Sequence, residues 1–444
     1  MANLLWTKRR LTPFQIIILG FAGVILTGAL ILMLPISSNS GTTSFHEALF
    51  TATSAVCVTG LVVQDTASYW SLFGQGVILI MIQIGGLGVI TVAAAFALLS
   101  GRKISLMQRS TIQEAIAAPQ LGGIVRLTGF IIRMTLIFEL IGACVMLPVF
   151  VKDFGIKGIW LAVFHSVSAF CNAGFDIMGT PNAPFVSLTS YKTDPIINST
   201  IMLLIIVGGI GFLTWDDIRS NQYCFQKYRM QSKVILVTTA ILITVPAIYL
   251  YFIEFKELPL QERIWVSLFH AVTPRTAGFN TIDLPLMSEA GQLVTILLML
   301  IGGSPGSTAG GIKTTTLAVL FANAIAVFCR KEDLHFFDRR VDGKVIRNAS
   351  TILLMYMTLF LGGGLIISIT EGLPIGVCLF ETASAIGTVG LSLGITTNLG
   401  RLSQFILIIL MFFGRVGGLT LIYAAMSGVN KANSKLPQEK IIVG

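Results

Sequence analysis

The chain has 444 residues, of which 54% are hydrophobic and only 11% are charged, and its formal net charge is +9. Soluble domains carry about 25% charged residues, so this composition excludes a soluble globular domain. Apolar runs of roughly 20 residues recur, as expected for helices that cross a bilayer. The alternating strands of about ten residues that build membrane barrels are absent. The sequence therefore predicts an all-α polytopic membrane protein.

The apolar runs are, in chain order, 14–36, 75–98, 127–150, 194–214, 233–254, 346–369 and 402–427. An eighth candidate, 290–329, is interrupted by the polar, glycine-rich stretch GGSPGSTAGGIKTTT at 302–316. Eight transmembrane helices are therefore expected, one of them broken. The six cysteines are scattered without the C-x-x-C spacing of zinc sites, so neither a metal centre nor a disulfide framework is indicated.

Lysine and arginine concentrate in alternate loops between the predicted spans. Of the 30 basic residues, 20 lie in the segments 8–10, 102–126, 219–233, 330–347 and 431–440. Cytoplasmic loops carry such an excess, so this bias and the even span number both place the two termini in the cytoplasm. The net positive charge is thus a signal of topology, and no nucleic-acid partner is expected.

Four segments of the chain repeat one pattern between successive spans. Each begins with Phe, contains Ser or Thr, and ends in Gly followed by Leu or Phe. They are FTATSAVCVTGL (50–61), FHSVSAFCNAGF (164–175), FHAVTPRTAGF (269–279) and FETASAIGTVGL (380–391). About 10–12 residues are too few to cross a bilayer as a helix, so each segment predicts a re-entrant half-helix.

This repetition predicts four units of span, pore loop and span around a pseudo-fourfold pore. Eight transmembrane helices and four half-helices result. The expected units are repeat 1 (1–100), repeat 2 (101–232), repeat 3 (233–345), repeat 4 (346–430) and a cytoplasmic tail (431–444).

The glycines that end the half-helices indicate an ion site made of backbone. Glycine permits positive φ, so successive carbonyls can turn inward, and a ring of carbonyls can replace the hydration shell of a monovalent cation. The candidate carbonyl donors are Val58, Thr59, Gly60, Asn172, Ala173, Gly174, Thr276, Ala277, Gly278, Thr388, Val389 and Gly390. Asp65, Asp176 and Asp283 follow the glycines closely and are either cation-attracting groups of an outer vestibule or ordinary loop aspartates.

The motifs VTGL, NAGF, TPRTAGF and TVGL, together with IQIGGLG and GGIGF, resemble the Trk/Ktr/HKT superfamily of potassium transporters. The chain is most similar to the KtrB/KtrD-type membrane subunit of bacterial Ktr uptake systems, over essentially its whole length. Gly60 occupies the position where some sodium-selective plant relatives carry Ser, which favours potassium. Cys57 departs from the Thr that is common just before that filter segment.

The resemblance implies K+ as the transported ion at a filter of backbone carbonyls, in the bacterial plasma membrane. It also implies a homodimer with one pore per subunit. A cytosolic ring of RCK-type subunits (KtrA or KtrC) would bind ATP or ADP and gate transport, so the nucleotide is on the partner and not on this chain. Na+ is implied as an activator.

The insert at 302–316 has three possible explanations. A nucleotide P-loop is disfavoured, because Ile312 separates Gly311 from Lys313 and no strand precedes the glycines. A plain broken span is the second. The third follows from position, because Gly302 lies 24 residues after Gly278, as Gly414 does after Gly390. A polar loop would then obstruct the pore just inside the filter.

The resemblance implies an intramembrane gating loop at this place. The candidate gate residues are Gly302, Gly303, Ser304, Pro305, Gly306, Ser307, Thr308, Ala309, Gly310, Gly311, Lys313 and Arg415. Charges within spans are costly and usually functional. Arg415 lies at the depth of the loop and is expected to contact it, although a snorkelling or structurally paired arginine is the alternative.

Potassium uptake through a gated filter is the predicted function. A secondary transporter of another small solute, which can also use broken helices around a midplane site, is the alternative. An enzyme is not expected, because the half-helices lack a Ser/His/Asp set, paired carboxylates or an HExxH motif.

Overall fold

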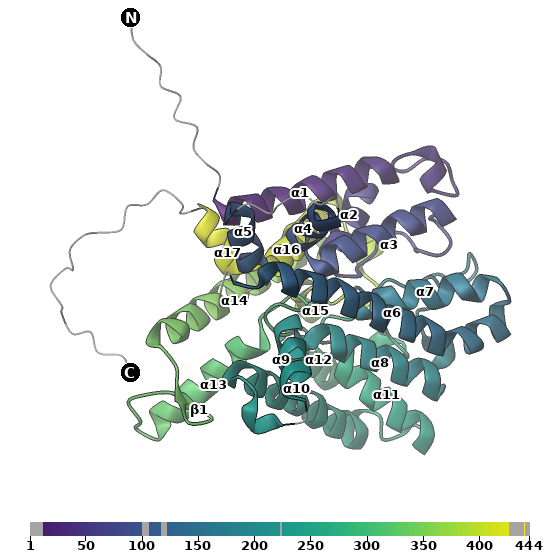
Figure 1. The fold of residues 1–444 in the computed structure, drawn as a ribbon. Coiled ribbons are helices and arrows are strands. Elements are labelled where there is room, and N and C mark those ends of the chain that lie inside the picture. The colour runs from purple at the N-terminus through teal and green to yellow at the C-terminus, as the bar shows by residue number, and fades with distance from the viewer. Residues whose placement is uncertain (1–11, 100–105, 117–121, 223, 426–438, 440–444) are drawn as a thin grey trace, which may run out of the picture.

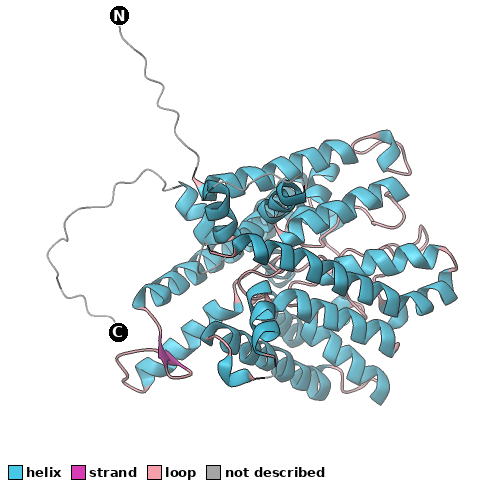
Figure 2. Cartoon of the chain, viewed as in Figure 1, coloured by secondary structure: helices cyan, strands magenta, loops and turns pink. Residues whose placement is uncertain are grey.

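The computed structural model describes residues 12–99, 106–116, 122–222, 224–425 and 439. This part of the chain is almost entirely helical (Figure 1). The strands described are β1 (His335–Phe336) and β2 (Arg339–Arg340), which form a small antiparallel hairpin, magenta in Figure 2. The predicted all-α class is confirmed. The predicted tail at 431–444 lies, except for Glu439, outside the described residues.

One long apolar helix opens each of the four predicted repeats. These helices are α1 (Pro13–Leu32), α6 (Ile124–Phe154), α10 (Met230–Tyr249), which continues as the π-helical turn η4 (Leu250–Glu254), and α14 (Gly343–Glu371). Each is long and apolar enough to cross a membrane, yet at most 33% of its most apolar window is buried inside the protein. Their exposed apolar faces suit contact with lipid, because the backbone is satisfied within the helix.

A short helix in each repeat ends at one of the predicted filter glycines. The four pore helices are α2 (Phe45–Val56), α7 (Lys157–Phe170), α11 (Leu260–Val272) and α15 (Ile375–Gly387). They contain 12, 14, 13 and 13 residues, too few to span a bilayer. Their last turns are buried in the apolar core, which places the following tripeptides at the centre of the molecule.

The second span of every repeat is interrupted. The pairs are α3 (Leu72–Leu87) with α4 (Val89–Leu99), α8 (Pro195–Ile210) with α9 (Phe212–Asn221), α12 (Glu289–Leu300) with α13 (Thr314–Phe328), and α16 (Arg401–Val416) with α17 (Gly418–Ala425). The first two pairs bend by 94°. The runs 75–98, 194–214 and 402–427, expected as continuous spans, are therefore broken helices.

Glycine conformation explains these breaks. Gly88, Gly211 and Gly417 have φ of 85°, 99° and 88°, a region that an α-helix cannot include and that glycine adopts without a steric penalty. By length and composition, four described helices can cross a membrane, or six if each bent pair is one span. The exact number of eight spans therefore stays a prediction.

Smaller elements complete the fold. The helix α5 (Leu106–Ile116) packs against α1 and α4. Five short 3-10 turns lie in the connections: η1 (Pro35–Ser37), η2 (Thr189–Tyr191), η3 (Phe225–Lys227), η5 (Leu284–Leu286) and η6 (Thr396–Asn398). The ring centroids of Phe14 in α1 and Tyr423 in α17 are 5.4 Å apart. The first and last described helices therefore meet at one end of the bundle (Figure 1).

Candidate functional site

Four tripeptides, here called the filter segments (58–60, 172–174, 276–278 and 388–390), follow the pore helices and close a ring. Each terminal glycine packs so tightly against the carbonyl of the next segment that an added Cβ would lie within 3.0 Å of its oxygen. The four contacts are Gly60 on Ala173, Gly174 on Ala277, Gly278 on Val389, and Gly390 on Thr59. The order runs from repeat 1 to repeat 4 and back, so the segments surround one axis.

The backbone of the filter segments is unusual at matched positions. The terminal glycines have φ between 67° and 96°. The residues two positions earlier are not glycine, yet they also have positive φ: Val58 57°, Asn172 57°, Thr276 64° and Thr388 52°. Such conformations cost about 1–3 kcal/mol each. Four at equivalent positions indicate that the surrounding structure holds this backbone shape.

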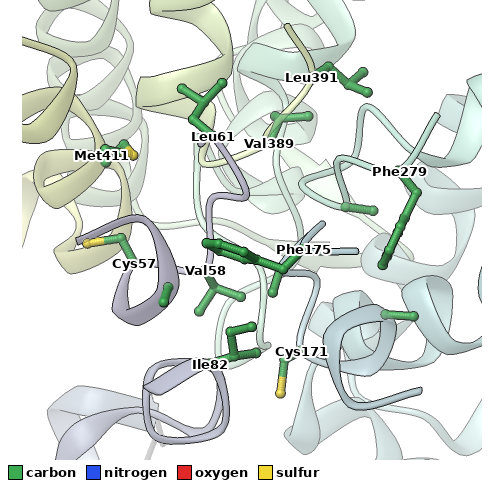
Figure 3. Packing of buried hydrophobic residues seen from close by; sticks show 14 of the residues in the cluster. Cys57, Val58, Leu61, Ile82, Cys171, Phe175, Phe279, Val389, Leu391 and Met411 are labelled. Atoms are coloured by element: carbon green, nitrogen blue, oxygen red, sulfur yellow. The ribbon is translucent and has the colours of Figure 1, made fainter. Parts of the chain in front are cut away.

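Large apolar side chains anchor the outer end of each filter segment. They follow directly after the four glycines, and each is at most 1% exposed: Leu61, Phe175, Phe279 and Leu391. Figure 3 shows them packed into the core around the segments. The recurrent Leu or Phe of the sequence pattern thus fixes the backbone beside the ring.

A hydroxyl from each pore helix also holds its filter segment, a role that sequence reasoning did not assign. In repeats 1 and 4 the serine oxygen accepts a hydrogen bond from the glycine N–H, in the pairs Ser54–Gly60 (3.1 Å) and Ser384–Gly390 (3.0 Å). In repeats 2 and 3 the hydroxyl donates to the carbonyl of the next residue, in the pairs Ser168–Phe175 (2.7 Å) and Thr273–Phe279 (2.6 Å). The bonding pattern therefore divides the outer end of the ring into two halves, each made of two neighbouring repeats. A Ser or Thr four residues after each Phe was the available signal.

A cavity of about 250 Å³ lies directly outside the ring and is lined by all four glycines. The three predicted vestibule aspartates line it too, but they differ in their bonds. The carboxylate of Asp65 accepts hydrogen bonds from the N–H and hydroxyl of Ser68 and from the N–H of Phe185. Asp65 therefore holds the loops of the vestibule, and Asp283 is exposed at its rim.

Asp176 is half-buried in this cavity and has little support from hydrogen bonds. Its Oδ1 accepts one bond, from the N–H of Met178 at 3.2 Å. Burial, and to a lesser degree the charge of Asp65, raise the pKa of Asp176 to about 7. A carboxylate with this environment gains from a cation placed beside it.

The predicted gate residues 302–311 and Lys313 lie in one loop, residues 301–313, here called the gate loop. Its neck is closed by bonds from Gly302 N to Ile312 O (2.8 Å) and from Thr314 N to Gly303 O (3.0 Å). Residues 314–316, the end of the polar stretch, form the first turn of α13 instead. The helix α12 precedes the loop, so the context is not that of a strand-borne P-loop.

The gate loop docks on the broken end of α8. Ser304 N donates to Gly209 O (2.9 Å), and Thr308 N donates to Gly208 O (3.3 Å). The last carbonyls of a helix have no partners within it, so the break in α8 supplies acceptors for the loop. The N–H of Phe212, on the other side of the break, donates to Gly306 O at 2.8 Å.

The same loop touches the inner end of the ring. The Thr308 hydroxyl donates to Asn172 Oδ1 at 2.9 Å, in the second filter segment. Gly310 lies so close to Thr388, in the fourth, that an added Cβ would lie within 3.0 Å of the threonine hydroxyl. The loop therefore lies against the first residues of the filter segments, on the side of the ring away from the cavity.

Arg415 joins the gate loop to the first repeat. Its guanidinium donates to the carbonyl of Thr308 in the loop and to those of Gly85 and Gly86 near the end of α3. The carboxyl end of a helix carries partial negative charge, which favours a cation there. Lys313 instead bonds within the loop, from Nζ to Ala309 O at 2.7 Å.

Comparison with known proteins identifies relatives over the full length. The model of the TrkH family, described as cation transport protein, matches residues 5–435. The potassium/sodium uptake protein NtpJ of Enterococcus hirae is 40% identical, covering 98% of each chain. The Ktr system potassium uptake protein B of Bacillus subtilis is 37% identical, over 98% of this chain and 97% of that protein.

Solved structures include one with the same fold. The potassium transporter TrkH from Vibrio parahaemolyticus matches with a TM-score of 0.73 at 17% identity, over 95% of this chain and 86% of that chain. The resemblance to Trk and Ktr proteins is thereby confirmed, and the matching family transports cations rather than catalysing a reaction. The chain belongs to the TrkH family of cation transport proteins.

Proposed function

We propose that this chain is a potassium-uptake subunit that passes K+ along the axis of the glycine ring. The closed contact order of the four filter segments supports this function most strongly. Curated relatives are named as potassium or potassium/sodium uptake proteins. Backbone carbonyls around an axis can replace the hydration shell of K+, and no titratable group is needed.

The gate loop is the proposed barrier to flux. It bonds to the second filter segment through Thr308 and abuts the fourth through Gly310. Arg415 adds positive charge below the filter, and charge of that sign opposes cation entry. Opening would require the gate loop to break its hydrogen bonds to the α8 carbonyls and to the Arg415 guanidinium at the same time.

Regulation is proposed to come from partners. The names of the Bacillus relatives refer to a Ktr system, which supports assembly with further subunits. We propose a homodimer in the bacterial plasma membrane, bound by a cytosolic ring of KtrA- or KtrC-like RCK subunits that hold ATP or ADP, with Na+ as an activator. The loops 99–125, 215–232 and 330–346 are the proposed docking surface.

Both termini are proposed to be cytoplasmic. The β1–β2 hairpin exposes Arg339 and Arg340, and Figure 1 places it at the same end of the bundle as the start of α1. The excess of basic residues at this end supports a cytoplasmic assignment.

Uptake by potassium-auxotrophic cells tests the proposed function. Cells that express the chain should take up K+, faster with Na+ and with the matching regulatory subunit present. Purified protein in liposomes should carry rubidium, with a rate that depends on the regulator. Flux of an organic solute without any monovalent cation would instead favour the secondary-transporter alternative.

The ionisation of Asp176 should make uptake dependent on external pH. Because the pKa of Asp176 is raised to about 7, the carboxyl is neutral below that pH and negative above it. The K+ uptake rate at subsaturating K+ is therefore expected to rise between about pH 6 and pH 8. Asp176→Asn should flatten this rise, and higher external K+ should move its midpoint to lower pH, because a cation stabilises the ionised form.

Asp283→Asn is the matched control for this titration, since Asp283 lies exposed at the rim of the same cavity. It should keep the pH dependence of the unmodified protein. A pH profile that is the same with and without the Asp176 carboxyl would contradict its role in attracting cations.

A further inference from the structure

Each pore helix carries a buried polar side chain directly after the Phe that begins its repeated sequence pattern. The four residues are Thr51, His165, His270 and Glu381, and none is more than 2% exposed. The repeat pattern places them at equivalent positions, on the pore helices beside the residues that follow each filter segment. Their chemistry differs, however, so this position departs from fourfold symmetry.

Glu381 binds the chain that follows the fourth filter segment. Its Oε1 accepts from the Ser392 hydroxyl at 2.5 Å and from the Leu393 N–H at 3.1 Å. Its Oε2 accepts from the Thr396 hydroxyl at 2.8 Å. All three donors lie within six residues of Gly390. An ionised carboxylate only accepts hydrogen bonds, so these donors match it.

The equivalent residues make fewer hydrogen bonds to the chain after their filter segments. Among the described residues, Thr51 Oγ1 and His165 Nε2 have no hydrogen-bond partner. The ring of His270 pairs with the hydroxyl of Thr281, three residues past Gly278, at 3.4 Å. Three pore helices therefore fold without a set of three hydrogen bonds like that of Glu381. This indicates that Glu381 does more than pack its own helix.

Two anchors from α15 enclose the fourth terminal glycine. On one side Ser384 Oγ accepts from Gly390 N, at 3.0 Å. On the other side Glu381 holds Ser392, two residues past that glycine. Both anchors stand on one rigid helix, and functional geometry is best kept when such supporting bonds lock it.

The held loop also reaches the neighbouring repeat. The Gln404 side chain donates from Nε2 to Thr396 O at 3.2 Å, and its Oε1 pairs with His46 Nε2. His46 stands in the first turn of α2, the pore helix of repeat 1. Repeat 1 is the one whose Thr59 carbonyl packs on Gly390. The loop after the fourth filter segment is therefore held by Glu381 of its own repeat and is linked through Gln404 to the pore helix of repeat 1.

We propose that Glu381 is a positioning residue that maintains K+ selectivity by holding the backbone of the fourth filter segment. This inference rests on the proposed potassium pathway. Glu381 does not contact the ion. Loss of its bonds frees the segment around Gly390 and Leu391, so the ring discriminates less well between K+ and Na+.

The test compares K+ and Na+ flux in liposomes for Glu381→Ala, Glu381→Gln and Ser392→Ala. Glu381→Ala removes all three acceptor contacts, and the K+/Na+ flux ratio is expected to fall roughly tenfold. Glu381→Gln keeps one acceptor oxygen and should give an intermediate ratio. Ser392→Ala removes one donor from the loop side and should lower the ratio about threefold, with the carboxylate unchanged.

Glu371→Gln is the matched control. Glu371 lies in the same repeat and accepts hydrogen bonds from Gly400 N and the Ser403 hydroxyl at the start of α16, beyond the residues that Glu381 holds. Its variant should keep the flux ratio of the unmodified protein. A general loss of stability would instead lower K+ and Na+ flux together and leave their ratio unchanged.

An unchanged flux ratio in folded Glu381→Ala and Glu381→Gln proteins would overturn the inference while K+ transport itself remains. If neither variant folds, Ser392→Ala decides: a lower ratio supports the role, and an unchanged ratio rejects it. Absence of K+ flux in the unmodified protein would reject the proposed function rather than the role of Glu381.

Discussion

Gly174→Ala is expected to reduce cation flux by roughly a hundredfold or more, since displacements of about 1 Å at a functional site have effects of this size. An added Cβ would lie within 3.0 Å of the Ala277 carbonyl oxygen and 2.9 Å from the Gly278 Cα. Backbone cannot rotate away as a side chain can, so the filter segments must separate. The measurement is rubidium flux into liposomes that contain purified, folded protein.

Gly394→Ala separates backbone strain from the clash in the ring. Gly394 lies in the same vestibule and also has a positive φ, 87°, but no atom lies within 4 Å of an added Cβ. Its substitution should cost about 1 kcal/mol of strain and leave flux near that of the unmodified protein. Equal loss in both variants, or flux that persists in alanine or serine variants of all four ring glycines, would contradict a pathway through the ring.

Arg415→Gln is expected to raise flux about tenfold in the absence of any regulatory subunit, because hydrogen bonds from a charged donor contribute about 1.5–3 kcal/mol each. The substitution removes the contacts to Thr308, Gly85 and Gly86 and also the positive charge below the ring. Rubidium flux from liposomes that lack the regulator measures the change. Thr308→Val, which loses the contacts of the hydroxyl to Asn172 Oδ1 and Phe170 O but keeps the positive charge, should raise flux by a smaller factor.

Arg401→Gln is the matched control for Arg415, since Arg401 is the exposed first residue of the same helix, α16. It should leave basal flux unchanged. A shortened gate loop that lacks residues 306–311 should raise flux more than either substitution. Unchanged or lower flux in folded protein with the shortened loop would show that residues 301–313 are not the barrier.

The sequence predicted the parts of this fold that depend on hydropathy and repetition. The spans opening the repeats and the four pore helices follow from run length. The Phe-to-Gly pattern identified the backbone that meets at the ring. The polar stretch at 302–316 was also recognisable, because glycine and serine are out of place between apolar helices.

Backbone conformation accounts for most of what the sequence did not predict. The breaks at Gly88 and Gly211 lie inside apolar runs, and hydropathy carries no information on φ. The β-branched residues Val58, Thr276 and Thr388 have positive φ against their own preference, and only the assembled ring imposes it. Local sequence cannot contain that constraint, because it arises from segments more than a hundred residues apart.

The contacts of the gate were likewise beyond sequence reasoning. Repeat counting placed Arg415 at the depth of the gate loop, but not its acceptors in α3. The carbonyls of Gly208 and Gly209 became available only because α8 ends there. A broken helix in one repeat thus forms the docking site for the loop of another.

The most direct measurement is anomalous X-ray scattering from crystals of the protein grown in rubidium salts. Rubidium peaks are expected on the axis of the ring, bounded by the carbonyls of the four filter segments, and they should be lost in Gly174→Ala. A protein that carries rubidium in liposomes but shows no peak at the ring, with peaks along another route, would contradict the proposed pathway.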